Sequence, residues 1–159
     1  MSVIVSKRSI SNMQFYKTAR DLRRDITKML EQMFNDESKF CYSRGLEYYL
    51  QTRILEIMGQ MMESITRANE IYPTTQEELT KRRLLQNDAI GYVSTLEQEL
   101  EYLVDLYPQK VKQIIMFSDE IDHELKLLRR WKKSTNKIIR SKGSDIDKVS
   151  IYKFVHQLH

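Results

Sequence analysis

The chain has few of the residues that break helices or cross-link a fold. Its 159 residues include one cysteine, two prolines and four glycines. The single cysteine, Cys41, excludes a disulfide within the chain and fits a reducing compartment. The scarcity of proline and glycine argues against a sandwich or a barrel and favours long helices.

Long apolar runs are also missing. The first apolar stretch, Val3-Ile4-Val5, is too short for the core of a signal peptide. No run approaches the roughly 20 apolar residues of a membrane-spanning helix. We therefore expect a soluble cytoplasmic protein that does not contact a membrane, with one domain that buries a core without metals or disulfides.

Residues suited to catalysis or metal binding are sparse. Glu120 and His123 have the Glu-x-x-His spacing of a di-iron ligand pair, but no second pair occurs inside the helices. The helical period also turns both side chains away from Ile121, which we place in the core. Phosphate-binding loops and nucleophile motifs are absent. We expect no enzyme activity, no metal or other cofactor and no small-molecule substrate.

Apolar residues recur every three or four positions through four segments, which indicates four amphipathic helices. The periodicity predicts helices over residues 12–34, 43–71, 75–106 and 108–136. Asn12 is the expected N-cap of the first helix, and Thr75 with Glu78 has the form of a capping box for the third. Pro73 and Pro108 mark the ends of the second and third helices.

Short connections between helices of similar length favour antiparallel neighbours. The sequence therefore predicts an all-α fold, an antiparallel up-down-up-down four-helix bundle over residues 12–137. A short N-terminal arm over residues 1–11 would precede it. A C-terminal extension over residues 138–159 would follow, with one short helix after Gly143 that packs on its own bundle or on a neighbouring subunit.

Two glycines, Gly59 and Gly91, fall inside the predicted helices. Glycine inside a helix costs about 1 kcal/mol relative to alanine. We expect each to mark a close crossing between helices.

The net charge of +4 hides a segregation of charge along the chain. Residues 1–34 hold 7 basic and 3 acidic side chains, residues 35–125 hold 9 and 17, and residues 126–159 hold 10 and 2. Between residues 126 and 142 there are eight basic side chains and no acid: Lys126, Arg129, Arg130, Lys132, Lys133, Lys137, Arg140 and Lys142. Like charges gathered on one surface repel unless a polyanion binds them.

The two basic segments are expected to meet in space, because an even number of antiparallel helices brings the start of the first and the end of the fourth together. A basic surface binds phosphates by Coulomb attraction and counterion release. An aromatic ring can stack on unpaired bases. We predict an interface for RNA or DNA that contains Arg20, Arg23, Arg24, Arg129, Arg130, Trp131, Lys132, Lys133, Lys137, Arg140 and Lys142. The alternative is that cations near a helix C-terminus only favour the helix dipole.

Three stretches resemble a known bacterial family of four-helix-bundle proteins. They are Gly45-Leu-Glu-Tyr-Tyr-Leu-Gln-Thr-Arg53, Ser64-Ile-Thr-Arg67-Ala68-Asn69 and Leu127-Leu-Arg-Arg-Trp131-Lys-Lys-Ser134. The family includes the accessory variability determinant of diversity-generating retroelements and the proteins encoded in 23S rRNA intervening sequences. The resemblance covers roughly residues 12–137.

The resemblance implies a pentameric homo-oligomer without catalytic residues. In the retroelements such a protein binds the reverse transcriptase and template RNA and supports mutagenic cDNA synthesis. The basic positions that it carries over are Arg20, Arg23, Arg24, Arg129, Arg130, Lys132 and Lys133. The chain departs from the family in residues 138–159 and in its acidic middle, which could meet a basic partner. The alternative function is a protein-interaction module of the intervening-sequence type that does not bind nucleic acid.

Overall fold

A computed structural model describes the backbone of residues 13–35 and 42–156, and the side chains of residues 13–35 and 42–137. The elements are α2 (Gln14–Phe34), α3 (Arg44–Glu70), α4 (Gln76–Leu106), the 3-10 helix η2 (Pro108–Lys110), α5 (Val111–Ile115) and α6 (Ser118–His156). Within these described ranges there are helices and no strand, so the predicted all-α class is confirmed. The predicted arm over residues 1–11 and Cys41 lie outside the described residues.

The first three helices begin and end within about two residues of the predicted bounds. Ser43 caps α3, because its hydroxyl accepts a hydrogen bond from the Leu46 amide at 3.3 Å. The predicted capping box of α4 is present, with Thr75 accepting from the Glu78 amide and Glu78 accepting from the Thr75 amide. Local capping therefore fixes where α3 and α4 start. Helix α2 starts after Met13, which makes no side-chain cap hydrogen bond, so the predicted N-cap at Asn12 is wrong.

The fourth predicted helix is broken in the structure. A turn at Met116 and Phe117 separates α5 from α6, and the Phe117 amide donates to the Ile114 carbonyl three residues back. This tighter winding stacks residues three apart above one another, and both Ile114 and Phe117 are buried. The break thus leaves Ile114 and Phe117 both in the core.

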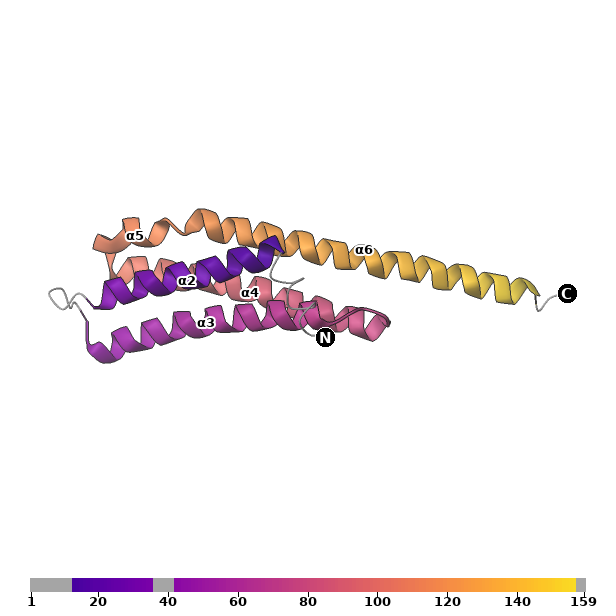
Figure 1. Ribbon diagram of the computed structural model, residues 1–159, viewed down its shortest axis with the longest axis horizontal. Helices are drawn as coiled ribbons and strands as arrows, with labels where there is room; N and C mark the ends of the chain where they lie inside the picture. The colour runs from indigo at the N-terminus through magenta and orange to yellow at the C-terminus, as the bar shows by residue number, and fades with distance from the viewer. Residues whose placement is uncertain (1–12, 36–41, 157–159) are drawn as a thin grey trace, which may run out of the picture.

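The separate C-terminal helix expected after Gly143 is not found as such. The backbone of α6 continues through Gly143 to His156 and extends past the ends of the other helices (Figure 1). Helices often end at a glycine with a positive φ, and no described glycine has one. Gly143 therefore does not stop the helix.

Side-chain contacts fix how the long helices lie against each other. Helix α2 packs on α3 and α6, and α4 packs on the same two helices (Figure 1). Between them lies one apolar core, whose fully buried members include Leu22, Ile26, Ile57, Met61, Leu96 and Leu128. The start of α3 lies beside the end of α4, because the Tyr107 hydroxyl donates to Glu47 at 3.2 Å.

The two helical glycines do not mark close crossings, so that prediction is wrong. A Cβ atom added to Gly91 would meet nothing within 4 Å. One added to Gly59 would lie 3.8 Å from an Arg23 guanidinium nitrogen, which is ordinary contact with a flexible side chain. Neither glycine has the positive φ that only glycine adopts easily.

Gly91→Ala should therefore stabilise the fold. Alanine loses less backbone entropy than glycine on folding and finds open space here, so we expect the free energy of unfolding to rise by about 0.5–1 kcal/mol. Urea denaturation followed by circular dichroism would measure it, with Gly59→Ala as a second, slightly more crowded site. A fall in stability for Gly91→Ala would show that a neighbour packs on this glycine after all.

Candidate nucleic-acid interface

The basic side chains of α6 form one continuous exposed row. Each residue of a helix turns about 100°, so Lys126, Arg129, Arg130, Lys133 and Lys137 fall within an arc of about 100°. All of them are exposed. The buried residues of the same helix, such as Leu128, lie on its opposite side. We call these five residues the basic stripe.

The described acidic side chains do not neutralise the basic stripe. Within the part of the chain whose side chains are described, the ion pairs join Arg24 to Asp21 and Asp25, Arg53 to Glu99, and Arg67 to Glu63. No stripe residue takes part in them. The stripe therefore presents a row of unpaired cations to solvent.

The start of α2 lies against this part of α6. Phe15 stacks on Trp131 with ring centroids 4.2 Å apart and planes at 14°. Arg20 and Arg23 follow Phe15 within about two helical turns, and both are exposed. This contact places the start of α2 beside the basic part of α6, whereas the Arg23 side chain lies toward Gly59 of α3.

The positive charge of Arg24 is offset by two neighbouring acids. Its guanidinium donates to Asp25 at 2.8 Å and to Asp21 at 2.9 Å. The hydrogen bond and the charge of Asp25 raise the pKa of Arg24, and the hydrogen bond from Arg24 lowers the pKa of Asp25. Two carboxylates thus surround this arginine, whereas Arg20 forms no ion pair with the described side chains.

Trp131 does not occupy the position that we predicted for it. The ring is 8 % exposed, and Phe15 covers one of its faces. It forms part of the core and is not free to stack on a base. Its apolar spacing from Leu128 and its bulk, which favour burial, outweigh its charged neighbours in the sequence.

Three other predicted residues, Lys132, Arg140 and Lys142, lie outside the basic stripe. Lys132 is half-buried and lies nearer the packed side of α6 than the stripe does. Arg140 and Lys142 lie on the α6 backbone, outside the residues whose side chains are described.

A row of polar groups lies between α4 and α6 near Trp131. The Gln86 amide donates to the Thr135 hydroxyl at 3.0 Å in a buried contact. The Arg82 guanidinium lies 5.6 Å from the ring centroid of Trp131, a cation–π distance, and donates to the Ile71 carbonyl at 3.4 Å. Burial lowers the pKa of Arg82 from its ordinary value. This arginine is a structural link between helices that the sequence had not indicated.

Glu124 is a buried acid within the acidic middle of the chain. Its side chain is 0 % exposed, and neither carboxyl oxygen has a hydrogen-bond partner among the described residues. Loss of hydration raises the pKa of Glu124 to about 8. The group is therefore mostly neutral at pH 7. The signal in the sequence was its spacing, three residues after Ile121 and four before Leu128.

The remaining ionisable groups of this segment point outward, as expected. Glu120 and His123 are both exposed. Within the described residues, no three or more histidine, cysteine, aspartate or glutamate side chains gather closely enough to hold a metal ion. Nor does any helix there have the length and apolar character needed to cross a membrane.

No family model matches the chain, and neither a curated protein nor a solved structure matches it. The resemblance to the retroelement accessory proteins stays a prediction that rests on the residues quoted for it.

Trp131→Ala should destabilise the fold strongly, because it removes a buried ring and its stack on Phe15. We expect a loss of about 3–5 kcal/mol in the free energy of unfolding, measured by urea denaturation. Trp131→Phe, which keeps an aromatic face, should lose much less. If Trp131→Ala keeps full stability but weakens nucleic-acid binding, the ring is a surface contact and the burial described above is wrong.

Glu124 should make stability depend on pH. Its folded pKa of about 8 lies above the ordinary value of 4.5, so the native state binds the proton more tightly than the unfolded state. Its contribution is full below about pH 4.5 and is lost as the pH rises toward 8, by on the order of 4 kcal/mol.

The matching measurement compares Glu124→Gln with the wild type by urea denaturation at several pH values. The variant should lack the decline, while the exposed control Glu120→Gln should retain it. Parallel pH profiles for Glu124→Gln and the wild type would mean that Glu124 is solvated in the folded protein.

Proposed function

We propose that this chain is a non-enzymatic nucleic-acid-binding protein built as an antiparallel up-down-up-down four-helix bundle. The observation that carries the proposal is the basic stripe of α6, whose five cations are exposed and have no acidic partner among the described residues. Arg20 and Arg23 of α2 are further exposed cations, although the Arg23 guanidinium lies toward Gly59 of α3. Such a surface attracts phosphates with little regard to base sequence.

In its finer form, the proposal is an accessory protein of a diversity-generating retroelement. It would act in the cytoplasm as a homo-oligomer, a pentamer by resemblance, and bind template RNA or cDNA together with the reverse transcriptase. The sequence resemblance over residues 12–137 supports this setting. A reverse-transcriptase gene beside this one, with paired template and variable repeats, would support it further.

A second candidate function is a protein-interaction module of the intervening-sequence type. It is favoured by exposed apolar side chains at the break in the fourth helix, Ile115 at 59 % and Met116 at 64 %. Those residues suit contact with protein, whereas the basic stripe suits contact with a polyanion.

The proposal predicts salt-sensitive binding that depends on the stripe. Replacing Arg129, Arg130, Lys133 and Lys137 by glutamine should weaken binding to single-stranded RNA and DNA of equal length. It should also reduce the slope of log K against log salt by about 0.7 per lost phosphate contact. Fluorescence anisotropy across a salt series would measure both.

The control variant loses the same number of positive charges at positions outside the stripe. Glutamine at Lys28, Arg44, Lys110 and Lys112, which lie away from the stripe, should leave affinity close to wild type. Equal losses in both variants would show that net charge alone drives binding. No binding by the wild type at about 50 mM salt, or binding without a salt slope, would overturn the proposed function.

A further inference from the structure

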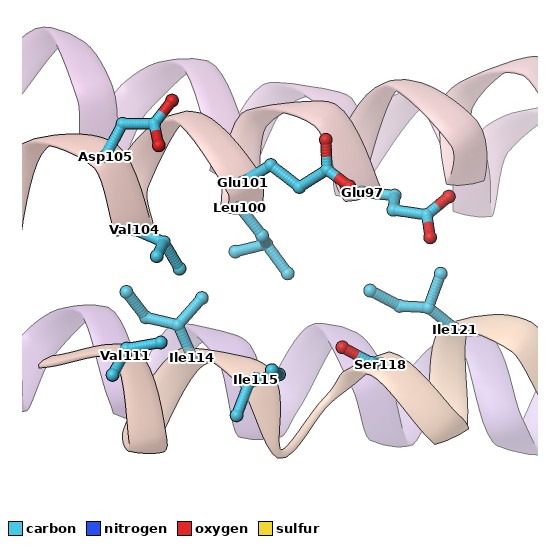
Figure 2. Close-up of a pocket in the computed structure, with 10 residues that line it drawn as sticks. All are labelled: Glu97, Leu100, Glu101, Val104, Asp105, Val111, Ile114, Ile115, Ser118 and Ile121. Carbon is cyan, nitrogen blue, oxygen red and sulfur yellow. The ribbon is translucent and has the colours of Figure 1, made fainter. Parts of the chain in front are cut away.

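A groove with an apolar floor lies between α4 and the broken fourth helix. Its volume is about 400 Å³. Figure 2 shows Leu100 and Val104 of α4 pointing toward Ile114 of α5 and Ile121 of α6. The turn at Met116 beside it leaves Ile115 and Met116 exposed at 59 % and 64 %. Apolar surface therefore continues from the groove onto its edge.

One wall of the groove carries a row of acids. Glu97, Glu101 and Asp105 line it from α4 and recur every four residues, which places them along one side of that helix (Figure 2). None of the three takes part in the ion pairs or side-chain hydrogen bonds found among the described residues. We call them the acidic row.

The acidic row works against the stability of its own helix. Like charges four residues apart repel, by a few tenths of a kcal/mol per pair. Negative charge near a helix C-terminus also opposes the helix dipole, and the last turn of α4 has no basic residue to offset it. A cation from outside the chain would relieve both costs.

We propose that this groove binds the basic stripe of a second copy of the chain. Arg129, Lys133 and Lys137 repeat every four residues, as the acidic row does, so both rows advance by about 6 Å per step. The aliphatic stems of such side chains can lie on an apolar floor while their charged ends reach the carboxylates at the rim. The groove and the basic stripe therefore carry opposite charges at the same spacing, and the apolar floor suits the stems of the basic side chains.

The contact is head-to-tail, because the groove and the stripe are different surfaces of one molecule. Such an interface closes into a ring or continues as an open chain. A polyanion would be repelled by the acidic row, so nucleic acid is not the ligand of the groove. Nucleic acid would instead compete for the stripe, a consequence that rests on the proposed function. Binding of nucleic acid should then release one copy from the next.

Sedimentation velocity of the full chain at low salt tests the proposal with two triple variants. The groove variant is Glu97→Gln, Glu101→Gln and Asp105→Asn, and the stripe variant is Arg129→Gln, Lys133→Gln and Lys137→Gln. Wild-type chain should associate as its concentration rises and dissociate at high salt. Each variant alone should lose that association while keeping the helical circular dichroism of the wild type.

A mixture of the two variants is the sharpest measurement. The groove variant still has a stripe and the stripe variant still has a groove, so equal amounts should form a 1:1 complex that grows no further. The control Glu56→Gln, Glu70→Gln and Asp88→Asn, with the same change of charge at other exposed positions, should associate like the wild type. A short single-stranded RNA added to wild-type chain should break its association.

Three results would overturn the inference. They are a wild-type chain that stays monomeric at low salt, association that survives either triple variant, and a mixture that forms no complex. If association follows the expected pattern but RNA neither binds nor disrupts it, the proposed function fails while the contact between copies stands. If RNA binds the stripe of a chain that stays monomeric, the proposed function stands and the contact between copies is wrong.

Discussion

Phe15 and Trp131 stack with their ring centroids 4.2 Å apart, and this contact sets how α2 lies along α6. The guanidinium of Arg82 approaches the same indole from α4. Three helices therefore take their positions from one side chain. Once Trp131 faces inward, the helical period turns Arg130, Lys133 and Lys137 outward. The exposed basic surface is thus a consequence of the packing of the tryptophan that interrupts it.

Polar groups inside the core modify this packing. The Gln86 amide nitrogen donates to Thr135 across α4 and α6, although the Gln86 Oε1 has no partner among the described residues. Glu124 has no such partner either and takes up a proton. A neutral acid is cheaper to bury than a carboxylate, but it is stable only while the pH stays below its raised pKa. The buried side of α6 thus makes the stability of the fold depend on pH, through Glu124. Its exposed side makes the proposed binding of a polyanion depend on salt, through the basic stripe.

Opposite charges are separated on the surface of a single chain. The basic stripe lies on α6, and the acidic row lies on α4 beside the break between α5 and α6. Neither is offset by neighbours among the described residues, and both depend on Coulomb interactions that salt screens. Binding of a polyanion and contact between copies would therefore respond to the same conditions, and through the stripe they would exclude each other.

The sequence by itself determined the parts of the fold that local physics controls. The bounds of α2, α3 and α4 follow from apolar periodicity, the Thr75–Glu78 capping box and two prolines, whose effects span a few residues. Charge counting likewise located the basic segment of α6. Apolar periodicity placed Ile121 on the buried side of α6. Only the tertiary structure decided which side chains cover Trp131 and Thr135, because Phe15 and Gln86 lie far away in the chain. The burial of Trp131 follows from its contact with Phe15, which a pattern of neighbouring residues does not contain. The break at Met116 is likewise a feature of the folded chain that the periodicity did not predict.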